Sequence, residues 1–169
     1  VARITPSRVS SLIENPNAFT KIIAPSRAIG RARAGTIVAF QRDNGDEPGR
    51  VQVSTSRDTG MTWTAARKTE IPNPGSSVEA LVMKDGRWAL VLNDTDHGRH
   101  RISIWASTDE GATWPVKKVL VEAEKGKGSF SYPALIQTAD GLLRLTFSWS
   151  REGQGETIGY VAIDPKELN

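Results

Sequence analysis

The 169-residue sequence has no cysteine, which excludes disulfide bonds and thiolate metal sites. It also lacks any apolar run near the ~20 residues that a membrane-spanning helix needs, and its basic start, VARITPSR, lacks the apolar stretch of a signal peptide. The sequence also lacks a large excess of one charge sign. Its 22 basic and 19 acidic residues give a net charge of +3, which is too small to indicate nucleic-acid binding. These absences favour one globular domain with neither a membrane nor a nucleic-acid partner. They leave the compartment open between cytoplasm and secretion.

One octet, Ser-x-Asp-x-Gly-x-Thr-Trp, occurs twice, ending at Trp63 in STSRDTGMTW and at Trp114 in ASTDEGATW. Its aspartates, Asp58 and Asp109, are 51 residues apart (positions 58 and 109), an interval typical of a repeated structural unit. In each copy a strand pattern leads into a turn whose aspartate can accept backbone hydrogen bonds and whose glycine can take a positive φ. Metal binding or acid catalysis is the alternative, but the shared turn pattern favours a β-hairpin corner.

The chain around these corners repeats a unit of four short strands. Gly35, Gly86 and Gly141 each precede an apolar strand, in AGTIVAF, DGRWALVLN and DGLLRLTFS, and a further strand pattern lies upstream of the last two. No helical period interrupts these strands. The pattern predicts an all-β fold, a β-propeller of four-stranded antiparallel blades with about three blades present.

We expect two parts, an irregular N-terminal segment over residues 1–25 and a partial β-propeller over residues 26–169. The blades are expected at about 26–75, 76–127 and 128–164, the last without the octet and without a fourth strand. Because a closed propeller has about four to eight blades, three blades leave strand edges open. We therefore expect half of a six-bladed propeller, completed either by N-terminal blades that this sequence lacks or by a second copy in a homodimer.

Two residues of the expected inner strands suggest chemistry. Glu79 lies six residues before Asp85 and Tyr132 eight before Asp140, so both side chains are expected to face the propeller axis. A tyrosine is a poor nucleophile at its ordinary pKa of about 10, and an adjacent carboxylate can take its proton as the oxygen attacks. The alternative is that Tyr132 is a packed aromatic residue and Glu79 a solvated one.

Arginine and tryptophan residues near the loop mouths are candidates for substrate binding. A sugar carboxylate is best held by planar guanidinium groups, and an aromatic ring can stack on a sugar. We expect contributions from Arg42, Arg101, Arg151 and Trp149, with Arg42 as the first choice; Arg99, in the same HGRHRIS run as Arg101, also lies near a loop mouth.

A histidine-containing loop, DTDHGRHR, is a further segment that could hold a metal. His97 and His100 lie near Asp94 and Asp96, but no further ligands accompany them. Solvated side chains are therefore expected, and neither a metal nor a cofactor is predicted.

These motifs together resemble the C-terminal half of the sialidase superfamily propellers, the bacterial neuraminidase repeat family. The resemblance rests on both octets, which match its Asp-box, and on the runs PNPGSSVEALVMKDGRWALVLND and FSYPALIQTADGLLRLTFSWS. It implies an exo-α-sialidase-like glycoside hydrolase that cleaves terminal sugars from glycans. By this resemblance Tyr132 is the nucleophile, Glu79 lies two residues from the position of the activating carboxylate, and Arg42 binds the substrate carboxylate.

The sequence departs from the sialidase pattern in several places. Asn93 stands where sialidases carry an arginine, and Ser148 where they carry a glutamate. The arginine and the acid/base aspartate of the first blades have no counterpart in these 169 residues. One alternative is therefore a catalytically inactive propeller for carbohydrate binding or scaffolding. Another is a related glycosidase or lyase that acts on a different acidic glycan.

Overall fold

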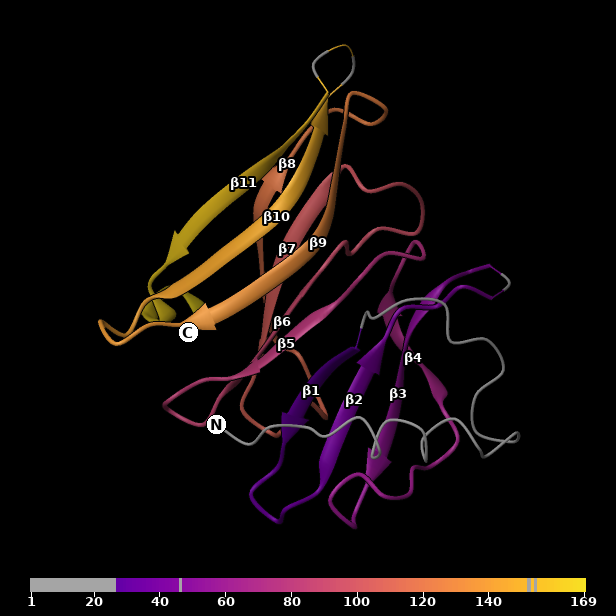
Figure 1. Cartoon of the computed structure of the whole chain (residues 1–169), viewed down its shortest axis with the longest axis vertical. Coiled ribbons are helices and arrows are strands. Elements are labelled where there is room, and N and C mark those ends of the chain that lie inside the picture. The colour runs from indigo at the N-terminus through magenta and orange to yellow at the C-terminus, as the bar shows by residue number, and fades with distance from the viewer. Residues whose placement is uncertain (1–26, 46, 152, 154) are drawn as a thin grey trace, which may run out of the picture.

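Eleven short strands form three antiparallel sheets in the computed structural model, which describes residues 27–45, 47–151, 153 and 155–169 (Figure 1). The first sheet contains β1 (Arg27–Arg31), β2 (Ile37–Gln41), β3 (Arg50–Ser56) and β4 (Arg67–Pro72) in that spatial order. The second contains β5 (Glu79–Val82), β6 (Trp88–Leu92), β7 (Arg101–Ser107) and β8 (Val116–Glu122). The third contains β9 (Gly128–Gln137), β10 (Leu143–Arg151) and β11 (Gly155–Ile163), followed by a 3-10 helix, Pro165–Leu168. The irregular segment expected over residues 1–25 lies outside the described residues.

The strands of each sheet follow the chain from the inside outward, as in a propeller blade. β1, β5 and β9 are the first strands of their sheets, and β5 lies against both of the others. Figure 1 shows the second sheet between the first and the third, with the three inner strands running in the same general direction. The structure confirms an all-β propeller of antiparallel blades, with three blades in the described part of the chain.

A glycine turn joins the first two strands of each blade. In the second blade, the Met83 N–H donates to the Arg87 carbonyl at 2.8 Å, and the Gly86 N–H donates to the Met83 carbonyl at 2.9 Å. Gly86 has a φ of 87°, which a glycine adopts at little cost. Gly35 and Gly141 occupy the same point of equivalent turns. The repeated glycines of the sequence therefore mark equivalent corners of three blades.

Asp58 and Asp109 hold the corners between the third and fourth strands of the first two blades. Asp109 accepts hydrogen bonds from the Thr113 hydroxyl at 2.6 Å, the Thr113 N–H at 2.8 Å and the Ser107 hydroxyl at 2.7 Å. Asp58 has the equivalent donors, and in both corners these bonds, that of the threonine hydroxyl foremost, lower the carboxyl pKa to about 2. The hairpin-corner prediction is confirmed.

Two apolar clusters connect the blades. One lies between the first and second blades and includes Phe40 and Leu90, and the other lies between the second and third blades and includes Val91 and Phe147. β6 contributes neighbouring residues to both clusters because successive side chains of a strand point to opposite faces. All five of its residues are buried. The second blade is therefore the centre of the described core.

Candidate active site

Tyr132 lies on the inner strand of the third blade, with 60% of its surface exposed. Its backbone φ is 53°, in the left-handed region that residues other than glycine rarely occupy. β9 contains one extra residue between its pairings with Thr146 and Ser148 of β10, which is a β-bulge. A bulge re-aims a side chain, and a strained backbone of this kind is concentrated at functional sites. Among the described residues, Thr59 and Glu110 in the Asp-box turns also have a left-handed φ, and Tyr132 is the one that lies in a strand.

Glu79 begins β5, the inner strand that lies against β9. Its carboxylate accepts a hydrogen bond from the N–H of Leu135, three residues beyond Tyr132 on β9. Burial raises the pKa of Glu79, and the hydrogen bond from Leu135 offsets part of that rise. A raised pKa brings a carboxylate closer to the proton affinity that a general base needs. The structure thus places Glu79 against the strand that carries Tyr132.

Arg99 and Arg101 have different surroundings although they are two residues apart. Arg101 Nε donates to Asp94 at 2.8 Å, so its charge is paired within its own blade. Arg99 reaches the third blade instead, where its Nη1 donates to the Ser131 hydroxyl at 3.1 Å, next to Tyr132. The sequence prediction favoured Arg101 for substrate binding, but the guanidinium beside the Tyr132 strand belongs to Arg99.

Arg42 directly follows β2 in the first blade and is half-buried. The adjacent Asp43 fixes this loop: its buried carboxylate pairs with Lys68 at 2.9 Å and accepts from the Gln52 amide at 2.9 Å. Desolvation by burial acts to raise the pKa of Asp43, but hydrogen bonds, led by that of Lys68, lower it overall. The backbone next to Arg42 is therefore held in place by the contacts of Asp43. Since the inner strand of a blade begins where the second strand ends, Arg42 lies at the same end of the sheets as the start of β9.

Trp149 and Arg151 lie together at the end of β10. The Arg151 guanidinium stacks 3.5 Å from the centroid of the Trp149 ring, a cation–π arrangement. The ring also packs against Phe130, with 5.8 Å between centroids. Because Arg151 covers one face of Trp149, that face is not open to a sugar. Arg151 also lines a cavity of about 300 Å³, as does Arg99.

Asn93 and Ser148, the two departures from the sialidase pattern, have structural contacts. Asn93 is fully buried, and its amide nitrogen donates to the Arg101 carbonyl at 2.7 Å and the Phe130 carbonyl at 3.2 Å. It therefore bridges the second and third blades. Ser148 is half-buried and pairs with Ser131 across the β9–β10 ladder. Neither position supplies a charge to the site.

The two histidines of the β6–β7 loop have separate surroundings. His97 Nδ1 lies 3.3 Å from Glu47 at the exposed surface, whereas His100 lies in the wall of the cavity. Within the described residues, no group of three or more His, Cys, Asp or Glu side chains is placed to hold a metal ion. In that same part of the chain, no helix has the length and apolar character needed to cross a membrane.

These observations define a propeller with Asp-box corners and with a tyrosine and a carboxylate on adjacent inner strands. The model of the BNR repeat-like domain family matches residues 5–145. The chain therefore belongs to the BNR repeat-like family. The resemblance to the sialidase superfamily that the sequence motifs indicated is confirmed.

Proteins similar to this chain include sialidases and an α-L-arabinofuranosidase. A curated sialidase of Paraclostridium sordellii is 34% identical over 61 residues, which are 36% of this chain and 14% of the relative. The solved Hadza microbial sialidase Hz136 is 26% identical, with a TM-score of 0.61 over 85% of this chain and 28% of that one. The α-L-arabinofuranosidase Arb93A of Fusarium graminearum is 19% identical, with a TM-score of 0.62 over 82% of this chain and 44% of that one. The fold is that of sialidases and related glycoside hydrolase propellers, and the chain spans less than half of each of these relatives.

Proposed function

We propose that the protein is an exo-acting, sialidase-type glycoside hydrolase that removes terminal sugars from glycans. The Tyr132 oxygen attacks the anomeric carbon while the bond to the leaving oxygen breaks, and Glu79 takes the phenolic proton. Water then hydrolyses the tyrosyl glycoside. A neutral tyrosine suits an anionic sugar because it approaches without the repulsion that a carboxylate would meet. The leaving oxygen needs an acid, which the sialidase resemblance assigns to an aspartate with no counterpart in these residues.

One observation carries this proposal: Tyr132 is exposed and strained on one inner strand, and Glu79 is anchored to that strand from the neighbouring one. Packing alone does not explain an exposed aromatic residue in a left-handed conformation, because the conformation is unfavourable and the exposed ring gains little burial. The raised pKa of Glu79 agrees with the role of a base.

For the substrate carboxylate we propose Arg42 and Arg99. Guanidinium groups bind carboxylates in planar, bidentate geometry, and Arg99 is held next to Tyr132 through Ser131. Arg101 contributes as a positioning residue, since its pair with Asp94 holds the strand that follows Arg99. Arg151, supported by Trp149, contacts the glycan further from the reacting bond.

Replacing Tyr132 with Phe tests the mechanism. The variant is expected to lose about 1,000-fold or more in kcat/KM on a fluorogenic α-sialoside, because no other group replaces the nucleophile. Tyr160→Phe is the matched control: Tyr160 is also an exposed tyrosine of the third blade, and its hydroxyl bonds only to the Arg144 side chain in the described contacts, at 2.6 Å. Full turnover by a folded Tyr132→Phe variant would contradict the mechanism. An α-L-arabinofuranoside assayed in parallel tests the related glycosidase alternative.

A non-catalytic carbohydrate-binding propeller is the second candidate function. It is favoured by Asn93, whose amide nitrogen is engaged by two backbone carbonyls at the position where sialidases carry an arginine. This candidate predicts binding on a glycan array without turnover of any glycoside. It also predicts that Tyr132→Phe leaves binding unchanged.

A further inference from the structure

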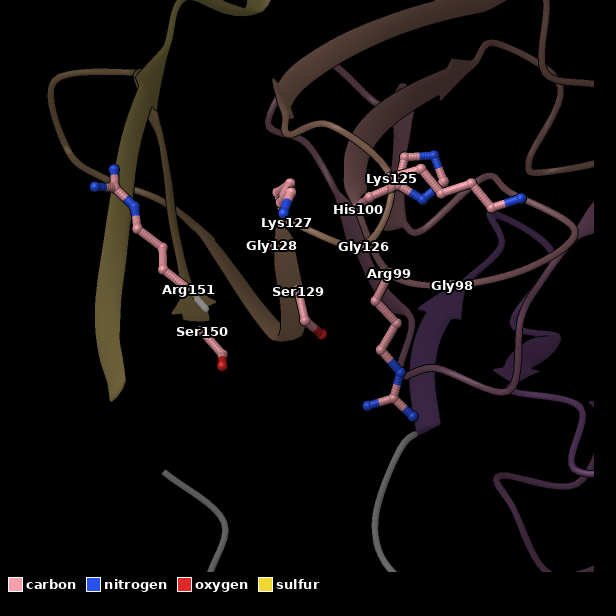
Figure 2. Close-up of a pocket in the computed structure, with 10 residues that line it drawn as sticks. All are labelled: Gly98, Arg99, His100, Lys125, Gly126, Lys127, Gly128, Ser129, Ser150 and Arg151. Atoms are coloured by element: carbon pink, nitrogen blue, oxygen red, sulfur yellow. The ribbon is translucent and has the colours of Figure 1, made fainter. Parts of the chain in front are cut away.

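A basic cavity of about 300 Å³ lies between the second and third blades, beside the start of β9 (Figure 2). Loops β6–β7 and β8–β9 and the end of β10 form its walls. Four cationic side chains line it, those of Arg99, Lys125, Lys127 and Arg151. His100 also lines the cavity. Among the described lining residues, none carries a negative charge. The charged side chains among its described lining residues are therefore all cationic.

Two of the cations are held in place before any ligand arrives. Arg99 donates to the Ser131 hydroxyl at 3.1 Å and to the Gly75 carbonyl at 3.3 Å. Arg151 rests on the Trp149 ring at 3.5 Å. Preorganised cations lose less side-chain entropy on binding than free ones do, so they favour association with an anion.

The cations surround the cavity without converging on one point. Figure 2 shows Arg99 and Arg151 on opposite sides of Ser129 and Ser150, with their guanidinium groups pointing in different directions. Lys125 extends from the loop on the Arg99 side. A single small anion would contact only part of this set, whereas a chain with several spaced charges can contact most of it. Hydroxyl groups such as those of Ser129 and Ser150 are suitable partners for sugar hydroxyls.

We propose that this cavity is a second anion-binding site that holds the charged groups of an acidic glycan, apart from the site of Tyr132. The bound groups are sulfate esters or carboxylates on sugars beyond the one that is cleaved. The inference that the ligand is a glycan rests on the proposed function. The inference that the cavity binds anions rests on its lining residues alone. Arg99 lines the cavity and also donates to Ser131, next to Tyr132 on β9, so the cavity adjoins the strand that carries the proposed nucleophile.

Isothermal titration of the protein with charged tetrasaccharides tests this proposal. The probes are a heparin-derived tetrasaccharide, which carries sulfates and carboxylates, and tetragalacturonate, which carries carboxylates only. At least one of them is expected to bind, with an affinity that falls as the salt concentration rises. Maltotetraose, of the same length and uncharged, is not expected to bind. Binding of both charged probes indicates carboxylate recognition, and binding of the heparin probe alone indicates sulfate recognition.

A charge-matched pair of variants distinguishes the cavity from a general effect of charge. Lys125→Ser with Lys127→Ser is expected to weaken binding about fivefold or more. Arg57→Ser with Arg67→Ser removes the same charge from exposed positions outside the cavity and is expected to keep the parent affinity. Equal weakening by both pairs, or no binding of either charged probe, overturns the proposal.

Two further measurements separate this site from the chemistry and from a single-anion site. Tyr132→Phe is expected to bind the charged tetrasaccharide like the parent, so that failure of the catalytic proposal leaves this result standing. Inorganic sulfate is expected to bind at least about tenfold more weakly than the tetrasaccharide, because one anion meets few of the dispersed cations. Equal affinity for inorganic sulfate overturns the extended-glycan proposal.

Discussion

The second and third blades are made of similar strands but differ in how they are covered. All five residues of β6 are buried, whereas buried and more exposed residues alternate over residues 143–147 of β10. The second blade has an apolar cluster on each face, and the third shares in one of them. Ile158 and Tyr160, on the other face of the third blade, are 67% and 57% exposed. The comparison shows that neighbouring blades, more than the sheet itself, bury the side chains of each blade.

The largest expected difference between the two blades concerns truncation of their apolar side chains. Leu90→Ala removes a fully buried side chain of β6 and is expected to lower the free energy of unfolding by about 3 kcal/mol, through lost burial and a cavity. Ile158→Ala in the third blade is expected to change it by less than about 0.5 kcal/mol, because Ile158 is exposed. Urea denaturation measures both. A cost for Ile158→Ala as large as that for Leu90→Ala would show that the open face is covered in solution, as closure of the propeller by further blades or a second copy would require.

A smaller difference is expected for added methyl groups. A Cβ at Gly30 would lie 2.5–2.9 Å from ring atoms of Trp88, which is 2% exposed and has no room to move. Gly30→Ala is therefore expected to cost about 2 kcal/mol through overpacking against the second blade. Gly141 in the third blade has a φ of 87° and open space around it, so Gly141→Ala is expected to cost about 1 kcal/mol from backbone strain alone. Thermal unfolding of the two variants shows which substitution lowers Tm more. A larger effect of Gly141→Ala would contradict the close packing of Gly30 against Trp88.

The smallest effect concerns the Asp-box corner, which the second blade has and the described third blade lacks. The folded-state pKa of Asp109, about 2, lies below its ordinary 3.8, so its carboxylate stabilises the fold above about pH 4. That stabilisation is lost as the pH falls through about 2. Asp109→Asn is expected to lower Tm by a few degrees at pH 7, and the difference from the parent protein should shrink between about pH 4 and 2. A difference independent of pH would contradict a role for the ionised form.

The sequence predicts much of this difference in burial between the two blades. WALVL is a continuous apolar run, which is typical of a strand buried on both faces, whereas LRLTF alternates as a half-covered strand does. The Asp-box and Asp-Gly turns likewise depend on local hydrogen bonds and on glycine conformation, so short stretches of sequence predict them. From these patterns the sequence predicted antiparallel strands joined by glycine turns and Asp-box corners, and the structure has them.

The contacts of the candidate site were harder to predict from the sequence. Arg99 precedes β7, which begins at Arg101, so the alternation of a strand does not tell which of the two arginines faces the neighbouring blade. The extra residue at Tyr132 is set by the pairing of β9 with β10, a contact between segments that sequence alternation does not encode. Burial of Asn93 between two blades also depends on tertiary packing.

Covalent trapping tests the central proposal, nucleophilic catalysis by Tyr132, most directly. A fluorinated sialyl inactivator, which slows hydrolysis of the glycosyl-enzyme, would be incubated with the protein, and the labelled peptide would be mapped by tandem mass spectrometry. The proposal predicts a single added fluorosialyl group on the Tyr132 oxygen, absent from Tyr132→Phe and retained in Tyr160→Phe. Turnover of the sialoside with the label on a carboxylate, or with Tyr132 unlabelled, would contradict it.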